Sequence, residues 1–271
     1  MTFDETPSGV RPGGSAYYSA LTARRLGLSV GLLTSIAPDY PLDVFPEGIE
    51  VATVASAHTT RYRLGLAKGA RTLSLLSRAA DLELEHLPAA WRGAPLALLC
   101  PVAGEVDPAL AGAFDDAAVA VRPQGWMRKR GRGGLMGPQP WEDAADVLPR
   151  THLLVLSEAE LPGGDADAVA WLQQVPLGAI THGKRGATLY VNSDSYHVGA
   201  DAAIETDPTG AGDVFATTLL IEYQRLGDAW EAAAAAACAG AAAVEAEGPA
   251  AIVDRRGLDA RLLAYRRSRG G

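Results

Sequence analysis

The stretch Asp207-Pro208-Thr209-Gly210-Ala211-Gly212-Asp213 leads directly into Val214-Phe215-Ala216-Thr217-Thr218-Leu219-Leu220-Ile221. The second segment is too densely apolar for a surface helix, so we expect a glycine-rich turn that feeds a buried helix. Small residues let backbone N–H groups approach a ligand, and the unpaired amides and the dipole at a helix start favour negative charge. The stretch therefore predicts an anion-binding site.

Asp213 needs its own explanation, because its carboxylate falls in the first helical turn, beside the predicted anion site. It has a task there if it accepts the proton of a hydroxyl that attacks phosphorus. In an isolated GxGD pattern we would favour a helix-capping aspartate and a simple turn. The full seven-residue context favours general-base action.

The sequence on both sides of this stretch predicts an α/β fold. Ser15 to Leu26 has small and apolar residues at helical spacing and is followed by Gly27, and further along the chain apolar runs typical of buried strands alternate with helix-compatible stretches. The predicted strands are Val30–Thr34, Leu96–Cys100, Ala118–Val121, His152–Leu156, Ala187–Val191 and Tyr196–Val198, and two further helices are expected at about 211–226 and 228–245. This alternation predicts a doubly wound, mostly parallel sheet flanked by helices.

Residues 49 to 78 have a different sequence pattern from the buried-strand and helix segments around them. Ile49–Val54, Thr59–Leu66 and Arg71–Leu76 are short, alternate in part, and are separated by small or turn residues. Such segments are typical of a small antiparallel sheet. We therefore expect a single domain over residues 1–271, in which residues of about 45–78 form this smaller sheet.

Composition excludes several classes of partner. The 24 Lys and Arg against 32 Asp and Glu give a net charge of −8, which argues against nucleic acid or an anionic membrane as the main partner. Cys100 and Cys238 cannot make a disulfide framework and have no metal-ligand spacing. The N-terminus lacks the pattern of a signal peptide. We expect a soluble cytoplasmic protein with a small-molecule partner.

Several motifs resemble those of one known family. Asp207–Asp213 resembles the DTxGAGD signature of the ribokinase-like (PfkB) carbohydrate kinases, with Pro208 in place of the commoner Thr. Gly13–Gly27 is similar to the N-terminal GGxxxNxA segment of the family and the A-x-x-LG that follows it. Ser157–Glu160 and Thr181–Ala187 are similar to the NxxE and TxGxxG motifs. The resemblance spans nearly the whole chain.

The resemblance implies a fold and an activity. The fold would be a mostly parallel sheet flanked by helices with a small antiparallel β lid, which covers the substrate and in some members forms a homodimer contact. The activity would be ATP-dependent transfer of a phosphoryl group to a hydroxyl of a small sugar or polyol. Asp213 would be the general base, and Gly210, Ala211 and Gly212 would offer amides to the transferred group.

The resemblance also implies roles for other residues. The substrate would contact Asp4, Gly13, Gly14, Tyr18 and Arg128, and the nucleotide would contact Ser157, Thr181, Gly183, Gly186 and Thr209. Glu160 would orient waters around Mg²⁺, and Asp207 would lie beside a monovalent cation such as K⁺ in members that use one. For Arg128 the alternative is a solvated surface loop, because it opens the basic run Arg128–Gly134 and such runs usually face water.

The chain departs from the family pattern at three further places. Tyr18 and Ser157 stand where the family usually has Asn, which affects substrate and nucleotide contacts. Family members begin with an apolar strand that ends in a substrate-binding Asp, whereas here only Met1-Thr2-Phe3 precede Asp4. We therefore expect a first strand that is largely truncated. Either the start codon was assigned too late, which is the interpretation we favour, or the chain fills the gap differently.

Two other functions stay open. A nucleoside kinase would need an aromatic platform for a base, which Tyr17, Tyr18 or Tyr62 could provide. A non-catalytic sugar or nucleotide sensor on the same fold would tolerate the departures from the pattern, although it would have no need of Asp213 as a base. The residues do not distinguish which acceptor is used, whether a monovalent cation is needed, or which oligomeric state forms.

Overall fold

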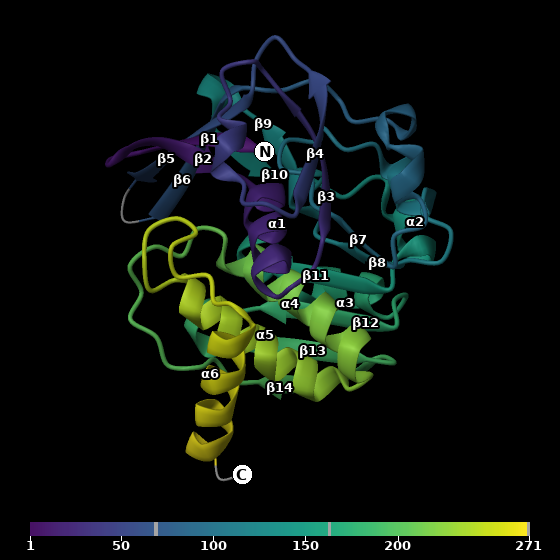
Figure 1. Ribbon diagram of the computed structural model, residues 1–271, viewed down its shortest axis with the longest axis vertical. Coiled ribbons are helices and arrows are strands. Elements are labelled where there is room, and N and C mark those ends of the chain that lie inside the picture. The colour runs from purple at the N-terminus through teal and green to yellow at the C-terminus, as the bar shows by residue number, and fades with distance from the viewer. Residues whose placement is uncertain (68–69, 162–163, 270–271) are drawn as a thin grey trace.

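The computed structural model describes residues 1–67, 70–161 and 164–269. The central sheet consists of β7 (Leu96–Leu99), β8 (Ala118–Val121), β11 (Leu153–Ser157), β12 (Leu177–Thr181), β13 (Ala187–Val191) and β14 (Asp194–Val198). These strands lie in the order β14-β13-β12-β11-β8-β7 (Figure 1). β7, β8, β11 and β12 are parallel, whereas β13 and β14 extend the sheet antiparallel. The predicted mostly parallel sheet is confirmed.

Helices flank this sheet as predicted. They are α1 (Ser15–Arg25), α2 (Ala144–Val147), α3 (Asp165–Leu172), α4 (Ala211–Leu226), α5 (Ala229–Ala243) and α6 (Arg255–Ser268). Single 3₁₀ turns lie at Leu42–Val44, Leu84–His86, Ala89–Trp91, Pro108–Gly112, Pro123–Gly125, Arg132–Gly134, Leu148–Arg150, Glu158–Glu160 and Gly183–Arg185.

Both faces of the sheet are covered, because successive side chains of a strand point to opposite faces. Leu153 and Val155 of β11 pack in one apolar cluster with residues of α4 and α5. Leu154 and Leu156, one position along, pack in another cluster with residues of α2 and α3. This two-sided burial explains why β11 is a continuous apolar run in the sequence.

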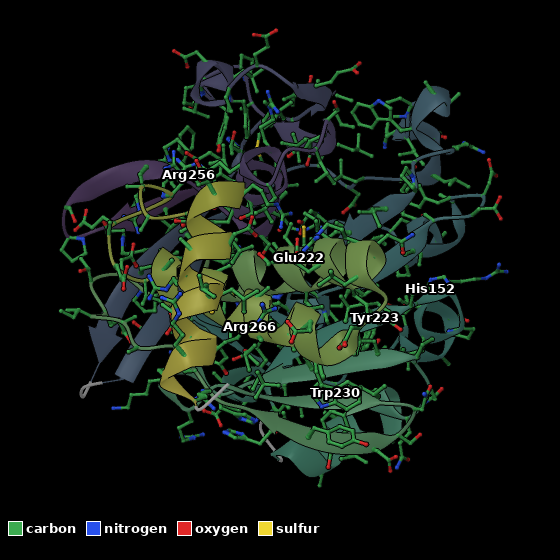
Figure 2. All side chains as sticks on the ribbon, turned by 60° about the horizontal axis from the view of Figure 1, so that its bottom comes forward. His152, Glu222, Tyr223, Trp230, Arg256 and Arg266 are labelled. Atoms are coloured by element: carbon green, nitrogen blue, oxygen red, sulfur yellow. The ribbon has the colours of Figure 1, made fainter. Side chains whose placement is uncertain are left out.

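α4 and α5 pack closely against each other. Most of the alanines of α5 are buried, and Gly240 approaches the start of α4 so closely that a Cβ there would lie 3.4 Å from the carbonyl oxygen of Ala211. Asp228 caps α5 by accepting hydrogen bonds from the backbone N–H groups of Trp230 and Glu231. Figure 2 shows the side chains of this layer, with Glu222 on α4, Trp230 on α5 and Arg266 on α6.

β3 (Val30–Ile36) and β4 (Ile49–Ala55) form a separate parallel pair. The prediction that residues 49–54 belong to the antiparallel lid is therefore wrong. A short run of apolar and polar residues suits either kind of sheet, so its periodicity alone cannot choose between them. The pairing of β4 with β3 along its whole length decides its place in the α/β body.

The smaller sheet forms the lid and has the order β2-β1-β5-β6. Its strands are β1 (Thr2–Thr6), β2 (Gly9–Gly13), β5 (Thr60–Ala67) and β6 (Ala70–Ser77). β5 and β6 pair antiparallel, as expected for this part of the chain, but β1 and β2 come from the N-terminal segment, which carries no clear strand pattern. β1 also pairs parallel with β5, so one of its two partners lies more than fifty residues away.

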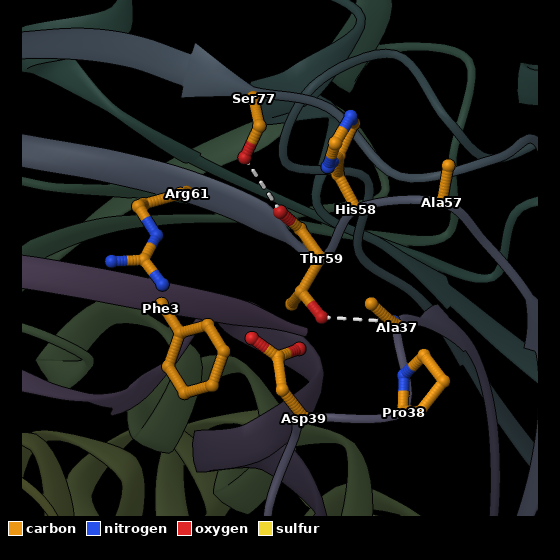
Figure 3. Close-up of a pocket in the computed structure, with 9 residues that line it drawn as sticks. All are labelled: Phe3, Ala37, Pro38, Asp39, Ala57, His58, Thr59, Arg61 and Ser77. Atoms are coloured by element: carbon orange, nitrogen blue, oxygen red, sulfur yellow. Dashed lines mark hydrogen bonds between the residues drawn. The ribbon is translucent and has the colours of Figure 1, made fainter.

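Thr59 joins the lid to the body (Figure 3). Its Oγ1 accepts a hydrogen bond of 2.9 Å from the backbone N–H of Ala37, and its carbonyl oxygen accepts one of 2.7 Å from Ser77 Oγ. The guanidinium of Arg61 stacks over the Phe3 ring at 5.0 Å in the same small hollow of about 320 Å³. These contacts fix the start of β5 against the loop after β3.

Within the described part of the chain, no helix has the length and apolar character that a membrane span requires.

Candidate active site

One large cavity of about 1280 Å³ lies between the lid and the carboxyl ends of the parallel strands. This edge is where open α/β sheets bind their ligands. All of the predicted site residues except Gly13 line it, namely Asp4, Gly14, Tyr18, Arg128, Ser157, Glu160, Thr181, Gly183, Gly186, Asp207, Thr209, Gly210, Ala211, Gly212 and Asp213. Residues far apart in the sequence therefore meet at one site.

The predicted anion-binding turn lies at the start of α4. Gly210 is the N-cap and has a φ of 82°, a left-handed conformation that favours glycine. Its Cα also lies against the ring of Tyr18, so that a Cβ would overlap the ring. Tyr18 thus supports the turn from behind while its other edge lines the cavity.

Asp213 is 7% exposed and forms an ion pair with Arg122, which is 5% exposed. Burial alone would lower the pKa of Arg122, but the carboxylates of Asp213 and Glu160 outweigh this effect and raise it. None of the sequence motifs contains Arg122. One signal was present, because it directly follows the buried strand β8 at the edge where parallel-sheet sites form.

Glu160 is surrounded by N–H donors. Its Oε1 accepts a hydrogen bond of 2.6 Å from Gln124 Nε2, and its Oε2 accepts one of 3.2 Å from the backbone N–H of Ser157. Arg122 Nη2 and Arg128 Nη2 lie 3.6 Å and 3.8 Å from Oε1. Ser157 and Glu160 form a capping box on a single 3₁₀ turn, which holds the carboxylate in this place.

These surroundings do not fit a protein-held Mg²⁺ at Glu160. Two guanidinium groups within 4 Å would repel a divalent cation at this carboxylate. Among the described residues, no cluster of three or more His, Cys, Asp or Glu could hold a metal ion. A magnesium ion in the cavity would depend on the phosphates of the donor for its ligands.

Arg128 is the one member of its basic run that turns inward to the cavity with a half-buried side chain. It begins the hairpin of β9 (Arg128–Arg130) and β10 (Met136–Pro138). Lys129 and Arg130 are exposed, as expected for a solvated loop. Burial lowers the pKa of Arg128, although Glu160 opposes this effect.

Asp207 anchors the turn rather than offering an open cation site. Its Oδ2 accepts hydrogen bonds from Arg11 and, at 3.2 Å, from the backbone N–H of Gly248, and its Oδ1 accepts one of 3.0 Å from the N–H of Thr209. Burial would raise the pKa of Asp207, but these hydrogen bonds lower it to about 2. A monovalent cation does not fit here, because the guanidinium of Arg11 already provides the positive charge.

The residues predicted to bind the substrate that accepts the phosphoryl group lie on the lid side of the cavity. Asp4 accepts a hydrogen bond of 2.7 Å from Thr2 Oγ1, and burial raises the pKa of its carboxyl. Gly13 lies behind Asp4, where any Cβ would overlap the carboxylate. Tyr62 is fixed by a 2.6 Å hydrogen bond to the carbonyl oxygen of Val102.

The opposite end of the cavity carries the predicted nucleotide residues. Thr181 Oγ1 donates to the carbonyl oxygen of Leu156 at 3.2 Å. Ala237, Gly240 and Ala241 of α5 form a wall of small residues. His182, in the same loop, is held by Glu158 and Thr188, each at 2.9 Å, as a structural histidine would be.

Comparison with known proteins agrees with this geometry. Residues 128–256 match the model of the pfkB family carbohydrate kinase. No curated protein sequence matches the chain.

Solved structures that resemble this one extend over nearly the whole chain. A pyrophosphate-dependent kinase in the ribokinase family has a TM-score of 0.81 at 19% identity, with 96% of each chain covered. Ribokinase from Thermotoga maritima has a TM-score of 0.75 at 20% identity, with 97% of this chain and 96% of that chain covered. Aminoimidazole riboside kinase from Salmonella enterica has a TM-score of 0.71 at 20% identity, with 96% and 97% covered. The fold is that of ribokinase.

Proposed function

We propose that the chain, whose residues 128–256 match the model of the pfkB family carbohydrate kinase, is an ATP-dependent kinase that phosphorylates a hydroxyl of a small sugar or polyol. The carrying observation is the place of Asp213. It is buried at the start of α4, in the same cavity as Asp4 of the lid and the small-residue wall of α5. A general base in this place lies between a phosphoryl acceptor bound on the lid side and a phosphoryl donor bound on the α5 side.

The chain's own groups account for the steps of the transfer. The terminal phosphate of the donor lies at the turn Gly210–Gly212, where the backbone and the helix dipole favour its charge. Asp213 takes the proton of the acceptor hydroxyl as the oxygen attacks phosphorus. The bond from phosphorus to the bridging oxygen breaks, and ADP leaves with those electrons. Asp213 then releases its proton to solvent.

The acceptor end favours a polyhydroxylated molecule. Asp4 offers a carboxylate oxygen to hydroxyl donors, and the backbone of Gly14 lies beside it in the cavity wall. The nucleoside alternative keeps Tyr18 and Tyr62 as aromatic residues in the cavity wall, whereas Tyr17 is buried within an apolar cluster. Inositols belong in the panel of acceptors, since one solved relative was complexed with myo-inositol and a pyrophosphate analogue.

Pyrophosphate is a second candidate donor. Two solved relatives with TM-scores of 0.81 are pyrophosphate-dependent kinases. The wall of Ala237, Gly240 and Ala241 favours ATP, because pyrophosphate has no ring to fill that end. Comparing the two donors at equal concentration separates the candidates.

The test is a screen of sugars, inositols and nucleosides with ATP or pyrophosphate, repeated with Asp213→Asn. The wild-type protein should phosphorylate a sugar or polyol, and Asp213→Asn should lower kcat by about 10²–10⁴-fold, as expected for loss of a general base. Circular dichroism and ATP binding serve as controls for the fold. Full activity of Asp213→Asn would contradict the mechanism, and tight ligand binding without turnover would favour the sensor.

A further inference from the structure

We propose that Arg122 is a catalytic residue, whose guanidinium binds the phosphoryl group in transfer while it holds Asp213 in place. This proposal rests on the proposed kinase function and adds a residue that the motifs do not contain. Arg122 directly follows β8, on the side of the cavity opposite the lid strands. Its sequence surroundings contain no motif that marks it as part of the anion site.

The position of the guanidinium is the first support. Arg122 Nη1 is paired with Asp213 Oδ1, and Nη2 lies 3.6 Å from Glu160 Oε1. A Cβ placed on Gly212 would lie 3.0 Å from Nη2, so the guanidinium packs against the backbone of the anion-binding turn. A phosphoryl group that reaches this turn therefore comes within reach of Arg122.

The unused hydrogen-bonding capacity of Arg122 is the second support. Its Nε is buried and has no hydrogen-bond partner among the described residues. A buried N–H donor without a partner costs free energy, and functional sites are where such groups are found. Because a guanidinium has five N–H donors, Arg122 can keep Asp213 and still bind phosphoryl oxygens.

The charge balance of the cavity is the third support. Asp213 and Glu160 are two buried carboxylates next to a turn that is to receive a polyphosphate. Arg122 and Arg128 are the guanidinium groups that face these carboxylates. The raised pKa of Arg122 keeps it charged at every working pH.

Arg122 acts in the transfer step as follows. The acceptor proton moves to Asp213, the new oxygen–phosphorus bond forms, and the bond to the bridging oxygen of the donor breaks. Negative charge is spread over the three equatorial oxygens at this moment, and Arg122 donates hydrogen bonds to them. When product leaves, the guanidinium keeps its pair with Asp213 and releases its hydrogen bonds to the phosphoryl oxygens.

The test compares Arg122→Lys and Arg122→Ala with the wild-type protein in steady-state kinetics on the acceptor found by the screen. We expect kcat to fall by about 10²–10³-fold in Arg122→Ala, as for loss of a donor to transition-state charge. KM for the acceptor should change less than about threefold, because Arg122 acts on the group in transfer. Guanidinium ion at millimolar concentration should restore part of the kcat of Arg122→Ala but not that of the wild-type protein.

Arg255→Gln is the matched control. Arg255 pairs with Glu222, a carboxylate that is 1% exposed and lies on the same helix as Asp213, far along from the cavity. Arg255→Gln should lower the melting temperature and leave kcat within about twofold. If Arg122→Ala keeps its kcat within about threefold, or if its loss only follows the unfolded fraction, the proposal is overturned.

A binding experiment separates this proposal from the kinase function itself. ADP with aluminium fluoride imitates the phosphoryl group in transfer, and its binding can be measured by calorimetry even when no acceptor turns over. We expect binding at least tenfold weaker in Arg122→Ala and unchanged in Arg255→Gln. Equal binding by Arg122→Ala and the wild-type protein would refute the role of Arg122. Absence of wild-type turnover with every acceptor and donor would count against the kinase function alone.

Discussion

Single residues at the turn before α4 carry much of the site geometry. Gly210 combines a positive φ with a Cα packed on the Tyr18 ring, and both features exclude a side chain. Tyr18 occupies the position where the family pattern has Asn, and the structure gives this departure a use as a support for the turn. The same ring places a buried hydroxyl, without a partner among the described residues, at the cavity wall.

Gly210→Ala should lower both stability and activity. A non-glycine residue at this φ costs about 1–3 kcal/mol, and overlap with Tyr18 would also displace the turn. Gly227→Ala is the control, because Gly227 ends the same helix with a φ of 67° and a Cβ there has open space. Chemical denaturation should show a loss in both variants, whereas kinase assays should show a loss of at least about tenfold only in Gly210→Ala. Equal activities would mean that the turn does not need this geometry.

Asp207 makes stability depend on acid pH. Its hydrogen bonds hold the folded-state pKa at about 2, below the usual value of 3.8. A carboxyl with a depressed folded-state pKa stabilises the fold above its unfolded pKa, and this contribution is lost as pH falls from 3.8 towards 2. The unfolding free energy of the wild-type protein should therefore fall more steeply over this window than that of Asp207→Asn. Parallel pH curves for the two proteins would contradict the assignment.

Secondary structure elements were predictable where the signal is local. The apolar runs of β7, β8 and β11 and the 3.6-residue spacing of α1 and α4 are visible in short windows of sequence, and each element is present. β1 escaped prediction because its pairing with β5 depends on contacts far along the chain. β2 pairs with β1 across a short turn, but neither segment has a clear strand pattern in the sequence. β4 was assigned to the wrong sheet for the same reason.

In the candidate site, too, residues with a local sequence signal were predictable and residues that depend on distant partners were not. Motif residues such as Asp213 and Gly210 were predicted to share a site, and they line one cavity. Arg11 and Arg122 were not predicted, because each acts through a partner about 90 to 200 residues away and neither belongs to a motif. The predicted homodimer through the lid stays a prediction.

The junction of α4 with α6 depends on a buried carboxylate. Glu222 contacts Arg225 of its own helix at 2.6 Å and Arg255 of α6 at 2.6 Å. Glu222→Ala should lower the free energy of unfolding by about 1–3 kcal/mol, because it leaves the guanidinium groups without a partner and opens a gap. Glu222→Met should cost less, since it fills the space and both arginines reach solvent. Denaturant titration measures the two variants, and equal losses would show that the ion pairs, not the packing, dominate.

At the scale of the whole molecule, Arg11 connects the lid to the body. It lies on β2, while its partner Asp207 lies at the turn before α4 and Glu247 lies 3.8 Å away at the other guanidinium nitrogen. The lid and the anion-binding turn are thus tied by a charge that belongs to the chain. This arrangement leads to a prediction about ions in solution.

Kinase activity should not depend on K⁺. Initial rates measured with potassium chloride and with choline chloride at equal ionic strength should agree within about twofold, because the Arg11 guanidinium supplies the positive charge at Asp207. Arg11→Ala should lose activity under both conditions, since the turn loses its link to the lid. Strong activation of the wild-type protein by K⁺ would show that a cation binds despite Arg11.

The alanine-rich helix α5 has a consequence for how the chain can change by mutation. Most of its alanines are buried, and near Gly240 it lies against the first residue of α4. A larger side chain at Ala236 or Ala239, both fully buried, would have to push α4 away and move the turn that begins it. Evolutionary drift in this part of the core is therefore constrained by function, although no atom of Ala236 lines the cavity.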